Sequence, residues 1–312
     1  MENLGSTDLE IFPLNLGGNV FGFTADERQS FEVLDAFTEG GGNFLDTADS
    51  YSAWVPGNEG GESEAIIGKW MAQRGNRDEI VIGTKVSQHP DRNGLGADNI
   101  RKAADDSLRR LQTDHIDLYY AHFDDESTPL EETLLAMDEL VKTGKVRYVA
   151  GSNYSPERIE EALAIQDRHG LARWVALQPH YNLVERDEFE NGGKQALAEK
   201  ENLAVIPYFS LAKGFLTGKY RSKDEPGDSP RAPAALDYLD DRGLRVLAAL
   251  DEVAETHGTE VAAVSIAWLK SQPTIAAPLA SARTTDQLKP LLTGARLELT
   301  SGEIDQLDSA SA

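Results

Sequence analysis

The sequence predicts an α/β protein that folds as one domain, a (β/α)8 TIM barrel spanning residues 1–312. Short apolar runs alternate with helical patterns along the whole chain, and short connections join them. About eight such units follow one another without a break in composition, which favours closure into a barrel over an open doubly wound sheet. A length of 312 residues also suits a single barrel.

The predicted strands share apolar or β-branched runs of a length typical of buried parallel strands. In chain order they are 14–19 (the weakest of the set), 44–47, 80–85, 116–122, 146–153, 174–178, 203–208 and 274–280.

Helical periodicity is clearest in two segments. In residues 128–145 the side chains of Leu130, Leu134 and Met137 fall on one face, Thr128 is expected to cap the first turn, and Gly144 suits a left-handed C-terminal residue. In residues 99–111 the apolar positions Ile100, Ala104, Leu108 and Leu111 repeat the pattern.

Two other segments carry specific expectations. The polar stretch 221–241 follows the seventh predicted strand and is expected to form a lid or substrate loop, because strand–helix alternation resumes after it. The end of the chain, "LTSGEIDQLDSASA", predicts one capped helix. Ser155-Pro156 predicts another helix start.

Composition excludes several classes of function. The net charge of −23 argues against a nucleic-acid partner, and any anionic ligand would need local cations. The absence of cysteine excludes disulfides and thiolate metal sites, and six scattered histidines do not have metal-ligand spacing. With no signal peptide and no apolar run long enough for a bilayer, we expect a cytoplasmic protein without a membrane partner. The sequence predicts no oligomeric state.

Polar residues stand at the ends of successive predicted strands, where the chemistry of a parallel barrel collects. Asp46 ends the second strand with Tyr51 close behind, Lys85 ends the third and His122 ends the fourth. Each alone is most simply a surface or turn residue. Together they predict a proton-transfer site in which a tyrosine donates, a lysine lowers its pKa, an aspartate holds the lysine and a histidine orients the substrate.

An ordered set of segments resembles the aldo-keto reductase family: "FLDTADSY", "GESEAIIGKW", "IVIGTKV", "DHIDLYYAHFDD", "GKVRYVAGSNYS", "ALQPHYNLVERD" and "AVIPYFSLAKGFLTGKY". The resemblance covers nearly the whole chain and points to the NADPH-dependent bacterial branch related to potassium-channel β-subunit-like reductases. It implies a (β/α)8 barrel that binds NADP(H) without a Rossmann motif, and no G-x-G-x-x-G segment opens a helix here.

Carried over by resemblance, the catalytic residues are Asp46, Tyr51, Lys85 and His122, while Asp49 matches no catalytic position. Arg283 is expected to read the 2′-phosphate of NADP(H). The chain departs from the family at Phe209-Ser210 and at Pro290-Leu291. The full set of cofactor residues that the resemblance implies is Gly18, Asp46, Ser152, Asn153, Gln178, Tyr208, Phe209, Ser210, Leu211, Ala212, Gly214, Gly218, Lys219, Ser281, Arg283 and Gln287.

The resemblance therefore implies an oxidoreductase that transfers hydride between NADP(H) and the carbonyl of a small aldehyde, ketone or sugar-derived substrate. Tyr51, Trp54, His122 and Phe123 are expected to contact that substrate, and Phe21 and Phe23 are further candidates for the pocket wall. One alternative is a cofactor-binding regulatory module of the channel β-subunit type with little turnover. Another is a barrel enzyme that uses Lys85 as a Schiff base, which the nearby Asp46 disfavours.

Overall fold

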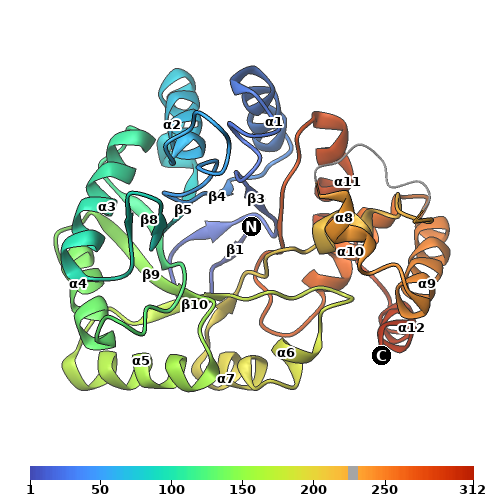
Figure 1. Cartoon of the computed structure of the whole chain (residues 1–312). Helices are drawn as coiled ribbons and strands as arrows, with labels where there is room; N and C mark the ends of the chain where they lie inside the picture. Colours follow the sequence, from blue (N-terminus) through green and yellow to red (C-terminus); the bar gives the residue numbers. More distant parts are fainter. Residues whose placement is uncertain (224–230) are drawn as a thin grey trace.

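A computed structural model describes residues 1–223 and 231–312 of the chain. Its centre is an eight-stranded parallel sheet with the strand order β11-β10-β9-β8-β5-β4-β3-β12. Helices surround this sheet, and the strands curl around a common axis (Figure 1). The predicted (β/α)8 barrel is confirmed.

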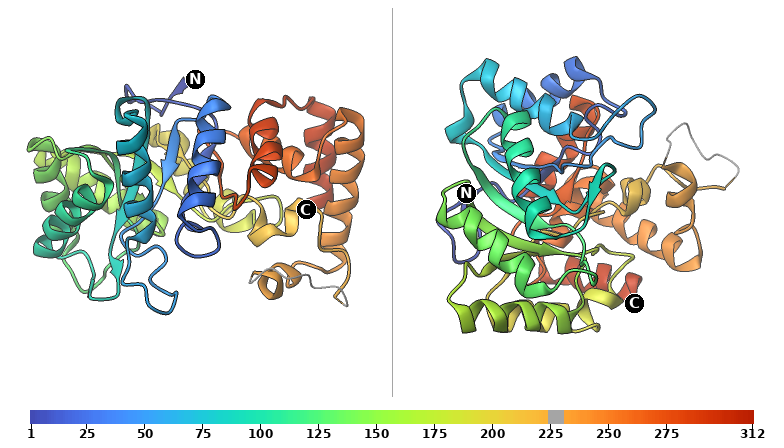
Figure 2. Two further views of the ribbon diagram at one scale, coloured as in Figure 1. Left: turned by 90° about the horizontal axis from the view of Figure 1, so that it is seen from above. Right: turned by 60° about the vertical axis from the view of Figure 1, so that its left-hand side comes forward.

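The strands of the barrel are β3 (Asn15–Gly17), β4 (Phe44–Asp46), β5 (Val81–Val86), β8 (Ile116–Ala121), β9 (Val146–Ser152), β10 (Trp174–Gln178), β11 (Ala204–Val205) and β12 (Leu279–Ala280). The helices are α1 (Glu27–Glu39), α2 (Glu62–Arg74), η1 (Arg77–Glu79), α3 (Ala97–Leu111), α4 (Leu130–Lys142), α5 (Pro156–His169), α6 (Asp187–Glu190), α7 (Lys194–Glu201), η2 (Ala212–Thr217), α8 (Ala232–Leu236), α9 (Asp241–His257), α10 (Val261–Lys270), α11 (Thr285–Arg296) and α12 (Ser301–Ser311). Helix α9 packs against α10 and α12 at one side of the barrel (Figure 2).

Backbone hydrogen bonds close the ring between the seventh and eighth strands. The amide of Val205 donates to Thr274 O, that of Ala276 donates to Val205 O, and that of Leu279 donates to Pro207 O, each at 2.9 Å. Regular strand structure is shorter here than the sequence predicted for 203–208 and 274–280. Pro207 and Pro278 interrupt both segments, and proline has no amide to donate to a ladder.

The helix starts predicted from sequence met with different outcomes. Ser155 caps α5 by accepting from Arg158 N, and Thr300 forms a capping box with Glu303 at the start of α12, as predicted. The prediction for Thr128 is wrong, because its hydroxyl donates to Asp125 Oδ2 at 2.7 Å and Pro129 precedes the first turn of α4. Gly144 has the expected positive φ of 77°.

An N-terminal hairpin that the sequence did not predict lies at the opposite end of the barrel from the strand tips. Its strands, β1 (Glu2–Asn3) and β2 (Glu10–Ile11), are two residues each, too short for a periodic pattern. Leu4, Leu9 and Ile11 pack into the same buried cluster as Phe44 and Leu118 inside the barrel. The hairpin therefore fills the N-terminal end of the barrel. A second short hairpin, β6 (Gln88–His89) with β7 (Arg92–Asn93), follows β5.

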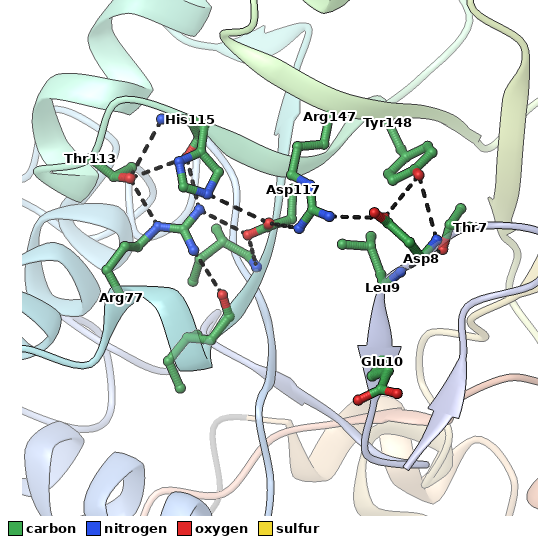
Figure 3. Close-up of polar contacts among 12 residues, drawn as sticks. Thr7, Asp8, Leu9, Glu10, Arg77, Thr113, His115, Asp117, Arg147 and Tyr148 are labelled. Atoms are coloured by element: carbon green, nitrogen blue, oxygen red, sulfur yellow. Dashed lines mark hydrogen bonds and ion pairs between the residues drawn. The ribbon is translucent and has the colours of Figure 1, made fainter.

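A polar network connects the N-terminal hairpin of β1 and β2 to the barrel (Figure 3). Asp117 on β8 is buried and accepts from Arg77 Nη2 at 2.8 Å, from the Ile82 amide at 2.9 Å and from Arg147 Nη1 at 3.1 Å. Arg147 also donates to Asp8 Oδ1 at 2.8 Å, in the loop between β1 and β2. Asp117 on β8 and Arg147 on β9 thus connect two strands of the barrel to the N-terminal hairpin.

The predicted lid at 221–241 is only partly within the described chain. Residues 224–230 lie outside the described residues, and the remainder contains α8 and the start of α9. The lid role stays a prediction. Within the described ranges, no helix combines the length and apolar character needed to cross a membrane.

Replacing Asp117 with Asn should destabilise the protein by about 2–3 kcal/mol, the scale for losing hydrogen bonds between a buried charge and charged partners. The amide keeps the shape of the side chain but removes the buried counter-charge of Arg77 and leaves Arg147 with Asp8 alone. Urea unfolding measures the change. The matched control is Asp105→Asn, whose partner Lys145 lies in an exposed pair, and its effect should stay within about 0.5 kcal/mol. Equal effects of the two variants would contradict the role given to Asp117.

Candidate active site

A cavity of about 670 Å³ lies at the C-terminal ends of the barrel strands. Asp46, Ser152 and Gln178 reach it from the last residues of β4, β9 and β10. Its volume is within the range of typical small-molecule and cofactor sites. The strand tips selected from sequence therefore surround one hollow.

A buried ion pair lies at the base of this cavity, where Asp46 lines it and Lys85 lies behind Asp46 and Tyr51. Lys85 Nζ lies 2.6 Å from Asp46 Oδ2, and both side chains are fully buried. The same ammonium donates to Thr47 O at 2.7 Å and to Tyr51 OH at 2.9 Å. The Tyr51 hydroxyl in turn donates to Asp46 Oδ2 at 3.1 Å. Three of the four residues expected to be catalytic thus form one hydrogen-bonded triangle.

Strand register explains why these residues meet. β4 and β5 are parallel neighbours, with Asp46 opposite Gly83, so Lys85 lies two residues beyond that position on the same face of its strand. After β4 the chain continues along β5, because the Thr47 amide donates to Gly83 O at 2.8 Å. Tyr51 follows on this turn and returns over the Lys85 ammonium, whose Nζ is 4.6 Å from the centre of its ring.

Burial shifts the pKa values of Lys85 and Tyr51 in the triangle. It lowers the pKa of Lys85 from its ordinary value, while Asp46 opposes that shift. Burial also raises the pKa of Tyr51 well above its ordinary value, and the negative charge of Asp46 raises it further. The sequence-based prediction that Lys85 gives Tyr51 a lowered pKa is wrong for the net direction in this structure. Tyr51 keeps its proton at neutral pH.

His122, the fourth expected residue, lies beside Tyr51 with the two ring centres 6.2 Å apart. Burial lowers the pKa of His122 well below its ordinary value, and the charge of Lys85 adds to that shift, so the imidazole is neutral. Among the described residues, its Nδ1 has no hydrogen-bond partner. A neutral imidazole carries one donor nitrogen and can orient a carbonyl oxygen next to the phenol.

A second group of expected residues forms a hydrogen-bonded wall. Tyr208 OH donates to Asn153 Oδ1 at 2.8 Å, and Asn153 Nδ2 donates to His122 O at 2.9 Å. Gln178 Nε2 donates to Asp46 Oδ1 at 2.8 Å, which connects this wall to the ion pair. The Tyr208 ring stacks on His180, with an interplanar angle of 13°. Sequence analysis did not identify His180.

Cations gather in the part of the cavity formed by later segments of the chain. Lys213, Lys219, Arg231 and Arg283 all line it. Burial lowers the pKa of Arg231, and the charge of Arg283 lowers it further, so the two guanidinium groups are close enough to interact. The acids Glu260 and Asp286 also line the cavity.

Residues near the start of α11 complete the wall. Ser281 Oγ donates to Asn19 Oδ1 at 2.6 Å, and the amide of Arg283 donates to Gln287 Oε1 at 3.0 Å. Thr284 caps α11. Pro290 and Leu291, where the chain departs from the family pattern, add an apolar surface to the cavity.

Three of the residues expected at the cofactor do not line the cavity: Gly18, Ala212 and Gly218. The Gly18 amide donates to Asp46 O at 2.7 Å, and a Cβ at this position would lie 2.6 Å from Ser63 Oγ, so the glycine permits close packing behind β4. Ala212 is buried, and Gly218 ends η2 with a φ of 78°.

Sequence analysis missed other residues of the wall. Asn19, Lys213 and Arg231 line the cavity, yet no pattern marked them. Asn19 is the last residue of the first predicted strand, 14–19, and its place at a strand tip was a usable signal. Arg231 lies in the polar stretch 221–241, where composition does not distinguish one cation from another.

The aromatic candidates occupy different places. Phe23 and Phe123 line the cavity, whereas Phe21 is fully buried. Trp54 lies at the rim, 52% exposed, with its ring 5.8 Å from that of Phe23 and 6.3 Å from that of Tyr51. Within the described part of the chain, no group of three or more histidine, aspartate and glutamate side chains could hold a metal ion.

Comparison with known proteins identifies the fold and its relatives. The model of the Aldo/keto reductase family matches residues 13–312. Protein tas of Escherichia coli (strain K12) is 31% identical over 97% of this chain and 95% of its own length. The "probable aryl-alcohol dehydrogenase AAD4" of Saccharomyces cerevisiae is 33% identical, covering 91% and 88% of the two chains. The "probable voltage-gated potassium channel subunit beta" of Oryza sativa is 32% identical, covering 92% and 88%.

The ion pair should be visible in unfolding measurements. Lys85→Met leaves Asp46 buried without its partner, Asp46→Asn does the reverse, and each should cost about 3–5 kcal/mol. The double variant buries no isolated charge, so its loss should be smaller than the sum of the two single losses by about 2 kcal/mol or more. The exposed pair of Lys69 with Glu27, changed to Met and Gln, is the matched control and should be additive. Additivity at Lys85 and Asp46 would show that the two charges are not coupled.

Proposed function

The chain belongs to the aldo/keto reductase family, and on that premise we propose that it is an NADPH-dependent reductase of small carbonyl compounds, with Tyr51 as proton donor. The observation that carries this proposal is the triangle of Tyr51, Lys85 and Asp46 at the base of the cavity, with His122 beside it. A protonated phenol held in place by a buried ion pair is suited to general acid catalysis.

The shape and charge of the cavity support a phosphorylated dinucleotide. Its volume of about 670 Å³ suits a large ligand, and its lining combines hydrogen-bonding groups near Tyr51 with the cations Lys213, Lys219, Arg231 and Arg283. The amide-bearing residues Asn153 and Gln178 would hold the nicotinamide carboxamide, and one face of Tyr208 would lie on its ring. Lys213, Lys219 and Arg283 would hold the phosphates, which a protein of net charge −23 would otherwise repel.

NADPH, when bound, supplies the hydride, and the protein supplies position and the proton. The substrate carbonyl oxygen would lie against Tyr51 OH and the donor nitrogen of neutral His122. As negative charge develops on that oxygen, both donors stabilise it, and Tyr51 transfers its proton. Lys85 Nζ, 2.9 Å from the phenol oxygen, then stabilises the phenolate. Asp46 keeps the ammonium in place throughout.

The aromatic rim supports planar aromatic carbonyls among the possible substrates. Phe23, Trp54 and Phe123 surround the approach to Tyr51, and Trp54 and Phe123 are 52% and 41% exposed. Exposed large aromatic side chains at a pocket mouth commonly offer a binding surface. The similarity to an aryl-alcohol dehydrogenase of yeast is consistent with this substrate class.

A second candidate function follows from the similarity to a potassium channel β subunit. In that case the barrel would bind the cofactor and act on a partner protein with little turnover. Steady oxidation of many equivalents of NADPH with an aromatic aldehyde supports the reductase. A single slow turnover would favour the regulatory module.

Tyr51→Phe should lower kcat about 100-fold or more, because the ring remains but the acidic proton is lost. NADPH affinity, measured by fluorescence titration, should change little. The matched control is Tyr148→Phe, which removes a tyrosine hydroxyl at the other end of the barrel, where it donates to Asp8. Wild-type kcat in Tyr51→Phe would exclude the phenol as proton donor.

Arg283→Ala should weaken NADPH binding roughly 10- to 150-fold, the value of one charged hydrogen-bonding contact. NADH affinity should hardly change, because NADH lacks the 2′-phosphate that the guanidinium would grip. Arg28→Ala, at an exposed arginine on α1, controls for the loss of one positive charge from an acidic protein. Equal weakening of NADPH and NADH, or a wild type that prefers NADH, would contradict the role of Arg283.

A further inference from the structure

A second buried polar cluster lies outside the barrel wall, behind Lys85. Its centre is Asp49, which lies in the turn after β4 and is fully buried. Sequence analysis assigned it no role. The Asp49 amide donates to Lys85 O at 3.2 Å, so this residue is attached directly to the backbone of the proposed catalytic lysine.

Asp49 is unusual because its carboxyl is buried without compensation. Among the described residues, neither Oδ1 nor Oδ2 has a hydrogen-bond partner. Buried carboxylates are normally paired or hydrogen-bonded, since removing an unpaired charge from water is costly. The side chain therefore has a reason to keep a proton.

A neighbouring acid on α2 shows the contrast. Glu64 is also fully buried, but Thr84 Oγ1 donates to its Oε1 at 2.5 Å and Arg110 Nε donates to its Oε2 at 2.6 Å. Glu64 is thus satisfied by β5 and α3. Its negative charge faces Asp49 and disfavours a second carboxylate there.

Other groups around Asp49 carry unused hydrogen-bonding capacity. In the described part of the chain, Tyr119 OH on β8 and Arg92 Nε and Nη2 on β7 are buried without partners. Arg92 has its Nη1 on Asp106 of α3. His89 on β6 is buried, and burial together with Arg92 lowers its pKa, so it adds no positive charge.

Strand geometry connects this cluster to the proposed active site. Thr84 faces Glu64 outside the barrel, and Lys85, the next residue of β5, turns inward to Asp46. The two buried clusters are therefore separated only by the thickness of one strand. The charge of Asp49 raises the pKa of Lys85, and the charge of Lys85 lowers that of Asp49.

We propose that Asp49 is a positioning residue that acts through Lys85: it is attached to the Lys85 backbone from outside the barrel wall, holds a proton of its own there, and adds its charge to those of Asp46 and Glu64 that favour the Lys85 ammonium inside. This inference rests on the proposed function of Lys85. Asp49 is thus a further ionisable group, which neither lines the cavity nor belongs to the expected set of catalytic residues.

The direction of the proton equilibrium agrees with this geometry. Burial, and then the charge of Glu64, raise the pKa of Asp49 from 3.8 to about 7, while Arg110, Arg92 and Lys85 oppose the shift. Asp49 therefore changes charge near neutral pH. Its ionised form favours the ammonium of Lys85, and its protonated form does not.

The first test is unfolding of Asp49→Asn as a function of pH, which needs no enzyme activity. Between pH 4 and 7 the native wild type retains a proton that the unfolded chain loses, so a rise in pH favours unfolding. The Asp49→Asn variant has no titratable group at this position, so it lacks this pH dependence of unfolding. The ratio of the wild-type to the variant unfolding constant should therefore rise by up to about tenfold per pH unit in this window, and level off above it. Asp98→Asn, at an exposed site on α3, should show a flat ratio.

The second test follows Lys85 directly by 13C NMR of the lysine ε-carbon, with the signal assigned by its absence in Lys85→Met. Asp49→Asn should lower the titration midpoint of Lys85, because the ammonium loses a nearby anion. The reduction rate, kcat/KM, should correspondingly begin to fall at a lower pH than in the wild type.

Arg92→Gln provides a variant that keeps Asp49. Removing this cation should move the titration of Asp49 to higher pH. In the Arg92→Gln background, the ratio of the unfolding constants with Asp49 and with Asp49→Asn should therefore keep rising to a higher pH. A flat ratio for Asp49→Asn, or an unchanged Lys85 midpoint in that variant, would overturn the proposal. Absence of carbonyl turnover in the wild type would instead refute the proposed function, while the unfolding and NMR measurements still decide the role of Asp49.

Discussion

The buried pair of Lys85 and Asp46 is the interaction on which the rest of this site depends. Two opposite charges at 2.6 Å are fully removed from water, an arrangement that persists only if geometry and additional hydrogen bonds compensate for desolvation. Thr47 O and Gln178 Nε2 provide those bonds from separate parts of the barrel. The parallel register of β4 and β5 brings the charges together, and closure of the ring brings Gln178 to them. The fold and the ion pair therefore support each other.

The protein as a whole is negatively charged, but positive side chains gather at one cavity. The whole chain carries −23, yet Lys213, Lys219, Arg231 and Arg283 line one cavity. Short-range interactions outweigh the global field there, because screening in salt solution reduces charge effects beyond roughly 10 Å. Inside the barrel wall the same principle applies to single groups. Asp46 faces a lysine, whereas Asp49, three residues further on, faces the acid Glu64.

Much of the barrel and of the proposed site could be predicted from sequence. The strand ending at Gln178 coincides with β10, and helices α3 and α5 begin and pack close to their predicted positions. The N-terminal hairpin could not be predicted, because two-residue strands have no period. The cap assigned to Thr128 failed for a local reason, since Pro129 occupies the cap position of α4 and Thr128 lies one residue before it.

The sequence by itself determined the order of strands and helices, the side chains at the strand tips, and hence the residue types available for proton transfer. The pairing of Asp46 with Lys85 was expected from the sequence, but the surroundings of Asp49 followed only from the tertiary structure. Asp46 and Asp49 look equivalent in "DTAD", but the turn after β4 directs one carboxyl into the barrel and the other towards α2. The tertiary structure likewise places Arg231 at the cavity and, by burying Tyr51, raises the pKa of its hydroxyl. The physical reason is that burial and charge environment are set by segments distant in the chain, which local patterns do not encode.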